Sequence, residues 1–109
     1  MSATVNGTTI VLTRGDTLKS TIVIYDKNGE QYTPVDGDAI RFAAKEKYTD
    51  YEPVILIDIP YDTCLLHVKP EDTKELDFGK YVYDIQITMN DGTVDTFIKG
   101  ILKLTEEVY

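Results

Sequence analysis

The sequence has little of the chemistry on which most catalytic sites depend. Its 109 residues include one cysteine, one histidine and no tryptophan. A single cysteine excludes an intrachain disulfide, which a small secreted domain would more often carry. Cys64 precedes Leu65 and Leu66, so we expect a small buried hydrophobic side chain, not an activated thiol. His67 lies between Leu66 and Val68 on an expected strand, and we interpret it as a solvated or edge residue.

Serine and metal chemistry are equally poorly supported. The only serines are Ser2 and Ser20, and Ser20 lies within an expected strand, so no Ser/His/Asp arrangement is indicated. The stretches 26–30 (DKNGE) and 36–38 (DGD) have calcium-like letters but lack the further spaced acids of a full loop. We interpret both as turns. The sequence has no glycine-rich phosphate loop and no zinc spacing, so we expect a protein that is not an enzyme and needs no cofactor or metal.

Positive charge is also scarce. Eleven Lys and Arg stand against nineteen Asp and Glu, which gives a net charge of -8. The basic residues are scattered along the chain, so nucleic acid and anionic membranes are poor expected partners. The longest aliphatic run, residues 54–57, is far too short to cross a bilayer. The first residues contain no basic region followed by an apolar run, so we expect synthesis in a reducing cytoplasm without a secretory signal.

The dominant periodicity of the sequence is two, which indicates strands. Turn dipeptides separate the alternating runs about every ten residues, as in a β-sandwich or barrel. We therefore predict one all-β domain spanning residues 1–109, with about seven antiparallel strands and a short helical turn near 70–76 that opens at Pro70. The predicted strands are 8–13, 18–25, 39–46, 54–59, 64–68, 80–89 and 94–104.

The final predicted strand has the longest alternation and one interruption. Its residues Val94, Thr96, Ile98, Gly100, Leu102 and Leu104 are expected to share one face. Gly100 lies in the middle of this strand, where we expect a bulge or a close neighbour. The dipeptides Asn6-Gly7, Asn28-Gly29, Asp36-Gly37 and Asp91-Gly92 are predicted turns, because glycine accepts the positive φ that tight turns need.

One short stretch resembles the corner between the E and F strands of immunoglobulin domains. In those domains a helical turn precedes the pattern D-x-G-x-Y-x-C, and here the residues are Asp77, Gly79, Tyr81 and Tyr83. The resemblance implies a tyrosine corner, in which the Tyr81 hydroxyl binds backbone upstream. Gly79 would supply a conformation that a Cβ resists. Tyr83 stands where the family has its second cysteine, so the inter-sheet disulfide and the core tryptophan of antibody domains are both missing.

A wider pattern resembles the small immunoglobulin-like tail domains of bacteriophages and prophages, and is similar to the N-terminal domain of phage baseplate upper proteins. The stretches that carry it are TRGDTL (13–18), YDKNG (25–29), D-x-I-R-F (38–42), KPEDT-x-x-L (69–76) and DGTVDT (91–96). The resemblance implies an immunoglobulin-like β-sandwich and a non-enzymatic virion component that is synthesised in a bacterial cytoplasm. Its expected partners are other phage tail proteins or further copies of itself.

The tripeptide Arg14-Gly15-Asp16 is also the integrin-recognition sequence of animal adhesion proteins. Three residues are a weak signal, and the tripeptide falls between the first two predicted strands. We interpret it as a turn in which Gly15 takes a positive φ and Asp16 binds nearby backbone.

Aromatic residues in predicted loops supply the remaining functional hypothesis. Tyr48 and Tyr51 fall in a predicted loop, and Tyr61 falls in the next turn. Such residues often mark interfaces, although they could instead cover the open end of a sandwich, which is the interpretation we favour here. Two alternatives to the tail module remain open: a binding domain for host-surface carbohydrate that stacks sugars on these tyrosines, and a bacterial adhesion domain.

Overall fold

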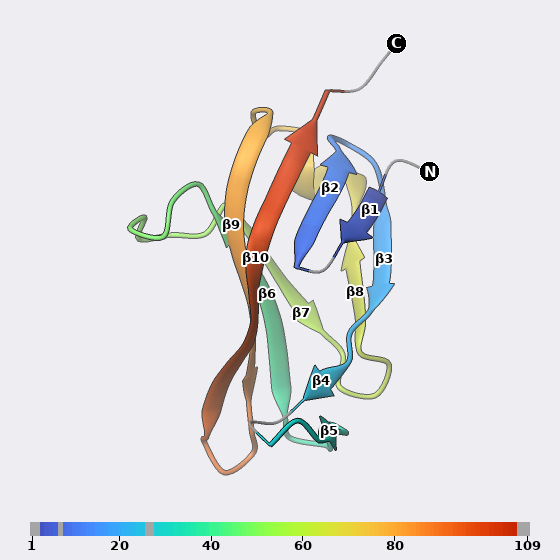
Figure 1. The fold of residues 1–109 in the computed structure, drawn as a ribbon, viewed down its shortest axis with the longest axis vertical. Coiled ribbons are helices and arrows are strands. Elements are labelled where there is room, and N and C mark those ends of the chain that lie inside the picture. Colours follow the sequence, from blue (N-terminus) through green and yellow to red (C-terminus); the bar gives the residue numbers. More distant parts are fainter. Residues whose placement is uncertain (1–2, 7, 26–27, 107–109) are drawn as a thin grey trace.

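The computed structural model describes residues 3–6, 8–25 and 28–106 of the chain, and this part is almost entirely β-structure (Figure 1). The all-β prediction is therefore confirmed. The elements are β1 (Ala3–Asn6), β2 (Thr9–Thr13), β3 (Leu18–Thr21), β4 (Ile24–Tyr25), β5 (Gln31–Tyr32), β6 (Ala39–Lys45), β7 (Ile55–Ile59), β8 (Leu65–Val68), α1 (Pro70–Thr73), β9 (Gly79–Thr88) and β10 (Val94–Thr105).

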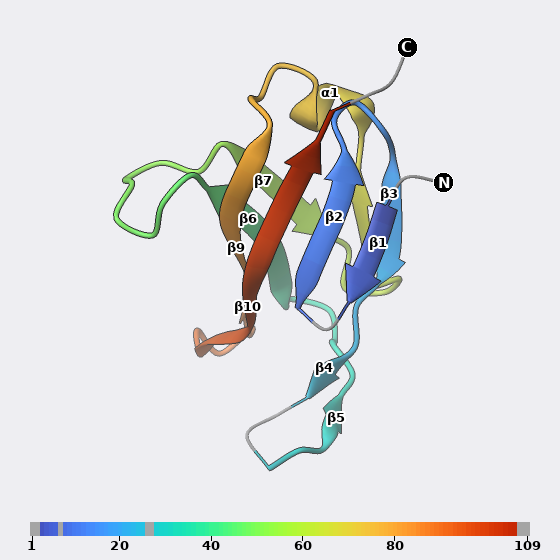
Figure 2. The same ribbon diagram turned by 45° about the horizontal axis from the view of Figure 1, so that its top comes forward.

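The predicted strands agree with the structure except near the N-terminal third. The predicted strand 18–25 is interrupted at residues 22–23, where the Ile22 N–H donates to the Cys64 carbonyl at 2.8 Å. The chain then leaves β8 and forms β4, which pairs with β5 as a small arm projecting from the body (Figure 2). The two short strands β1 and β5 were not predicted. The predicted turns at Asn28-Gly29, Asp36-Gly37 and Asp91-Gly92 are confirmed, with positive φ at each glycine, whereas Gly7 lies outside the described residues.

Six strands form one sheet in the order β1-β2-β10-β9-β6-β7, and β3 pairs with β8 in a second, two-stranded sheet. Every described pair is antiparallel except β2 and β10, which run parallel from Thr9 beside Ile101 to Thr13 beside Thr105. The expectation of antiparallel strands throughout is wrong for this pair. Strands so far apart in sequence need no tight turn between them, so local turn chemistry does not restrict their relative direction.

The apolar core lies between the six-stranded sheet and the β3–β8 pair, which Figure 1 shows on the opposite side of the molecule from β9 and β10. Alternate residues of each strand enter it, as the period of two predicted. Its buried hydrophobic members are Ile10, Leu12, Leu18, Ile24, Ile40, Phe42, Ala44, Ile55, Ile59, Leu66, Val68, Tyr81, Tyr83, Ile85, Ile87, Leu102 and Leu104.

A β-bulge in β10 changes which side chains face this core. The register against β9 shifts between Thr96 and Ile98, so that Thr96 lies beside Gln86 while Ile98 lies beside Ile85. Residues from Ile98 onward keep the predicted face, but Val94 and Thr96 lie on the outer face of the sheet. The prediction of one shared face is therefore wrong before the bulge, because the extra residue reverses the alternation.

The predicted helical turn is confirmed as α1, which begins at Pro70. The Lys69 N–H donates to the Asp72 carboxylate at 2.8 Å, so this acid binds a backbone donor at the helix start. Further turns continue to Leu76, whose N–H donates to the Thr73 carbonyl at 2.9 Å. No helix in the described part of the chain has the length and apolar character that a membrane span requires.

Candidate functional site

The Arg14-Gly15-Asp16 tripeptide forms the connection between β2 and β3, where the sequence predicted a turn. The Asp16 N–H donates to the Thr13 carbonyl at 3.0 Å and closes the turn. Gly15 has a φ of 84°, as expected. The Gly15 N–H donates to the Thr73 hydroxyl at 2.8 Å, which fastens the turn to α1.

Contacts on the arginine side of this turn are also internal. The Arg14 guanidinium donates to the Leu76 carbonyl at 3.1 Å. It also lies 4.2 Å from the centre of the Phe78 ring, in cation–π range. The tripeptide therefore binds the segment around α1 to the β2–β3 connection, which supports a structural role for these residues.

The predicted tyrosine corner is present. The Tyr81 hydroxyl donates to the Asp77 carbonyl at 2.7 Å, and the Tyr81 side chain is buried. Burial raises the pKa of Tyr81 above its ordinary value. Gly79 has a φ of 138°, a region that residues with a Cβ rarely adopt. These contacts join the loop after α1 to the start of β9.

Tyr83, two residues after Tyr81 on β9, is buried in the core. Its ring stacks on Phe42 with centroids 5.1 Å apart, and its hydroxyl donates to the Thr8 carbonyl at 2.6 Å. Burial raises the pKa of Tyr83. A Cβ on Gly100 would lie 1.9 Å from that same carbonyl oxygen, so the close neighbour expected at Gly100 is the backbone of Thr8.

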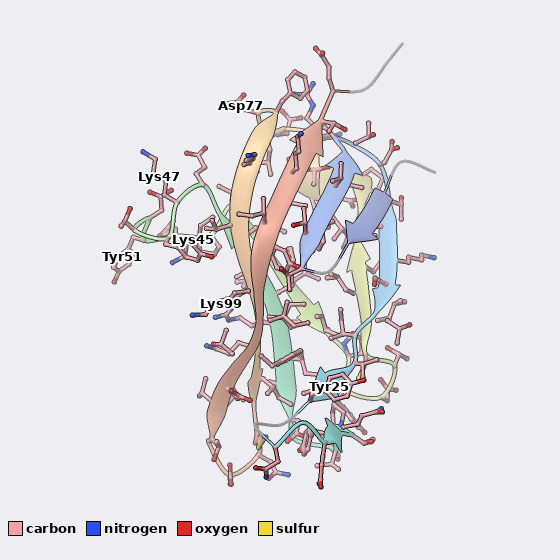
Figure 3. The ribbon with its side chains drawn as sticks, viewed as in Figure 1. Tyr25, Lys45, Lys47, Tyr51, Asp77 and Lys99 are labelled. Carbon is pink, nitrogen blue, oxygen red and sulfur yellow. The ribbon has the colours of Figure 1, made fainter. Side chains whose placement is uncertain are left out.

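Tyr48 and Tyr51 lie in a loop between β6 and β7 that projects from the sheet (Figures 1 and 3). Tyr51 is 96% exposed and Tyr48 is 64% exposed, so neither covers the open end of the core, which was the favoured interpretation. The loop has its own hydrogen bonds: the Lys47 N–H donates to the Asp50 carboxylate at 3.2 Å, and the Lys45 ammonium donates to the Asp50 carbonyl at 2.9 Å. Both tyrosines therefore project from a loop that internal hydrogen bonds hold in place.

Tyr61 does not join this pair. It lies after the end of β7, whereas the loop with Tyr51 precedes the start of that strand. Tyr61 is 37% exposed, and its carbonyl accepts a weak hydrogen bond from the Cys64 thiol at 3.5 Å. The structure thus separates the three candidate tyrosines into two surfaces.

The acidic turn at residues 36–38 is hydrogen-bonded to other segments through Asp38. Its carboxylate accepts hydrogen bonds from the Tyr32 hydroxyl at 2.5 Å, from the Val35 N–H at 3.0 Å and from the Asn90 N–H at 3.1 Å. The Tyr32 hydrogen bond is the main cause that lowers the pKa of Asp38, and it raises the pKa of Tyr32. The carboxylate thus ties the β4–β5 arm to the turn between β9 and β10.

Asp26, in the other calcium-like stretch, lies outside the described residues. Across residues 3–6, 8–25 and 28–106, no three His, Cys, Asp or Glu side chains are grouped so that they could hold a metal ion.

Cys64 directly precedes β8, and His67 lies within that strand. Cys64 is partly buried and has a φ of 52°, an uncommon value for a residue other than glycine that the sequence did not predict. Burial is the main cause that raises the pKa of its thiol, and this disfavours the nucleophilic thiolate. His67 faces away from the buried Leu66 and Val68, as expected, and lines a hollow of about 410 Å³ between β7 and β8.

Sequence reasoning missed a grouping of basic side chains. Arg41, Lys45, Lys80, Lys99 and Lys103 lie at alternate positions of β6, β9 and β10 and share the outer face of the six-stranded sheet. Figure 3 shows Lys45 and Lys99 on the side away from β3 and β8. Five of the eleven basic residues are therefore gathered on one surface, in contrast to the scattered arrangement expected. The spacing of four between Arg41 and Lys45, and between Lys99 and Lys103, was a usable signal.

The sequence matches no protein-family model and no curated protein.

Proposed function

We propose that this chain is an immunoglobulin-like β-sandwich module of a phage or prophage tail, which acts without catalysis by packing against other tail proteins or against copies of itself. Three features support the immunoglobulin-like part of the proposal. The β3–β8 pair lies across the core from the larger sheet, β2 runs parallel to the last strand, and Tyr81 makes the corner hydrogen bond to Asp77.

The observation that carries the packing role is the presentation of Tyr51. Its side chain is almost fully exposed on a loop that internal hydrogen bonds hold in place. An exposed aromatic ring on an ordered loop loses little conformational entropy when a partner covers it. Leu56, on the neighbouring edge strand β7, is 62% exposed and extends the apolar surface available to such a partner.

Fractionation of the virus particles tests the tail role directly. Particles would be produced from the bacterial strain that encodes this chain, purified by density, and analysed by mass spectrometry for its peptides. We expect the chain to copurify with tails at a fixed ratio to other tail proteins. Recovery of the chain only from the soluble cell fraction, with particles fully assembled without it, would overturn the proposal.

A matched pair of variants tests the tyrosine loop within those particles. Tyr48→Ala combined with Tyr51→Ala removes both exposed rings, and we expect a reduced amount of the chain in purified tails. Tyr25→Ala is the control, because Tyr25 is 57% exposed but lies on the β4–β5 arm. Equal incorporation of both variants would show that the rings of this loop make no essential contact.

Carbohydrate binding is the second candidate, and the same exposed rings favour it. Sugars stack on aromatic faces, and Tyr48 borders a hollow of about 220 Å³ next to Lys45. Titration of the isolated chain with host cell-wall glycans would support this function, or a related adhesion role, if binding is saturable and is lost on Tyr48→Ala.

A further inference from the structure

A positively charged surface covers the outer face of the six-stranded sheet in a chain whose net charge is -8. We name the surface formed by Arg41, Lys45, Lys80, Lys99 and Lys103 the basic face. Lys80 and Lys103 are directly opposite each other in the β9–β10 pair. Like charges at such positions are destabilising, so their placement together calls for a compensating contact.

The cationic side chains of the basic face have few hydrogen-bond or ion-pair partners within the chain. Arg41 forms an ion pair with Asp84 at 2.8 Å, and Lys45 donates to a backbone carbonyl. No ion pair within the described residues joins Lys80, Lys99 or Lys103 to an acid, and all three side chains are exposed. Two acids share this face, since Asp84 lies opposite Lys99 and Asp58 lies opposite Arg41. Five cations thus stand against two carboxylates, which leaves an excess of positive charge.

Apolar side chains lie between these cations. Val82 and Ile101 are cross-strand partners at the centre of the face, and Lys45 lies beside Val82 on the other side. Next to them is the hollow of about 220 Å³, lined by residues that include Ala43 and Tyr48. An apolar centre with a charged rim is the usual anatomy of a protein interface. Tyr48, in the β6–β7 loop, thus borders the basic face.

An acidic surface of the same chain is available at the other end of the sheet. The turns at residues 36–38 and 90–92 lie together, because the Asn90 side-chain amide donates to the Asp36 carbonyl at 3.3 Å. Asp36, Asp91 and Asp95 are exposed there, and we name these three residues the acidic end. Hydrogen bonds from Thr93 lower the pKa of Asp91, and the charge of Asp38 opposes this lowering, so Asp38 adds to the negative field at this end.

We infer that the basic face binds the acidic end of a second copy of this chain. This inference rests on the proposed packing function and specifies its partner. The two surfaces are different parts of one molecule, so the contact is heterologous and copies add head to tail. Such a contact generates a ring when its rotation closes and a filament when it does not, and both are architectures that a tail component can use.

Charge decides between this partner and nucleic acid. The eight excess negative charges of the chain repel a polyanion and a second copy alike, but the evenly spaced phosphates of a polyanion would also meet Asp58 and Asp84 among the five cations. A second copy presents its acids locally, on two adjacent turns with exposed carboxylates. The acidic end of a neighbour is therefore the partner that the charge distribution favours.

Light scattering after size exclusion, with the full chain over a wide concentration range, tests the inference. The runs would be made at about 0.01 M and about 1 M salt, between which the screening length falls from about 30 Å to about 3 Å. We expect a mass above that of the monomer at low salt and the monomer mass at high salt. A monomer at every concentration in low salt would overturn the inference.

Charge reversal locates the contact. Lys99→Glu with Lys103→Glu should weaken association at least tenfold. Lys19→Glu with Lys74→Glu makes the same change in net charge at exposed positions outside the basic face, and should leave most association intact. Equal loss in both variants would show that only net charge matters and would overturn the inference. Circular dichroism would confirm that each variant is folded.

A complementation experiment identifies the acidic end as the partner. Asp36→Lys with Asp91→Lys should also fail to associate alone, whereas a mixture with the Lys99→Glu, Lys103→Glu variant should associate, because each supplies the sign that the other has lost. No association in the mixture would overturn the assignment. Binding of labelled single-stranded DNA by a chain that stays monomeric would assign the face to polyanions. Neither result depends on particle fractionation. Failure of the self-association inference can therefore be told apart from failure of the proposed tail function.

Discussion

The hydroxyl of Tyr83 donates a 2.6 Å hydrogen bond to the backbone carbonyl of Thr8, although 75 residues separate the two in sequence. The carbonyl also approaches Gly100 so closely that a side chain there would collide with it. One backbone oxygen therefore joins the β1–β2 connection to β9 and β10. In a chain whose single cysteine cannot form an internal disulfide, this contact and the stacking of Tyr83 on Phe42 connect strands that are distant in sequence.

Removal of the Tyr83 hydroxyl should destabilise the protein. We expect Tyr83→Phe to lower the free energy of unfolding by about 1 kcal/mol, because the ring still packs but the hydrogen bond is lost. Urea denaturation would measure this, with an unchanged dependence on urea concentration. Tyr48→Phe, at an exposed hydroxyl, is the control and should have no measurable effect. Identical midpoints for the two variants would contradict the prediction.

A methyl group at Gly100 should lower the free energy of unfolding by more than the loss of the Tyr83 hydroxyl does. In Gly100→Ala the new Cβ would meet backbone, which cannot rotate away as a side chain can, so we expect a loss of at least about 1–3 kcal/mol. The loss would be measured as a lower midpoint of urea or thermal denaturation. Lys99→Ala, at the adjacent exposed position, should stay within about 0.5 kcal/mol of the native chain. The prediction fails if Gly100→Ala is equally tolerated.

The contact between the Arg14-Gly15-Asp16 turn and α1 should depend on the Thr73 hydroxyl. Thr73 is fully buried and accepts the Gly15 N–H, so Thr73→Val keeps the shape but leaves that donor without its partner. We expect a loss of about 1–3 kcal/mol in the free energy of unfolding. Thr17→Val, at an exposed residue of the same connection, serves as the reference. Similar stability of the two variants would exclude a structural role for this hydrogen bond.

Acid should weaken the network at Asp38. The folded-state pKa of Asp38 lies below its ordinary value of 3.8, chiefly because of the Tyr32 hydrogen bond. A lowered pKa stabilises the folded state above the unfolded-state pKa, and this stability is lost as the pH falls through the folded-state value. Urea midpoints should therefore decline below about pH 4.

Asp38→Asn should show a lower midpoint at neutral pH and a shallower decline in acid, because the titrating carboxyl is gone. Asp36→Asn changes an exposed carboxyl in the same turn and should retain the native acid dependence. If Asp38→Asn and the native chain lose the same stability between neutral and acidic pH, the carboxylate network does not contribute to acid sensitivity.

Prediction from sequence succeeded where short-range chemistry decides the structure. The period of two located β6 and β9 to within one residue at each end, because successive side chains of a strand face opposite sides of a sheet. The turn at Gly15 followed from its dihedral freedom, and the corner at Tyr81 from the resemblance of residues 77–83 to the immunoglobulin pattern. These features depend on residues within a few positions of each other.

Prediction from sequence failed where segments that are distant along the chain meet. The bulge in β10 reversed the faces of Val94 and Thr96, and no local signal marked its position. The parallel pairing of β2 with β10 joins opposite ends of the chain. The exposure of Tyr51 depends on the direction in which its loop leaves the sheet, and alternation within a strand carries no information about that direction.

The sequence alone determined that the chain is all-β, where most of its strands begin and end, and that glycine turns separate them, because these properties follow from side-chain periodicity and local dihedral preferences. Only the tertiary structure decided the order and direction of the strands in the sheet. It also decided that Lys80, Lys99 and Lys103 share one face. Charges far apart in sequence become neighbours only when strands pair, since the register of that pairing is set by the packing of the whole core.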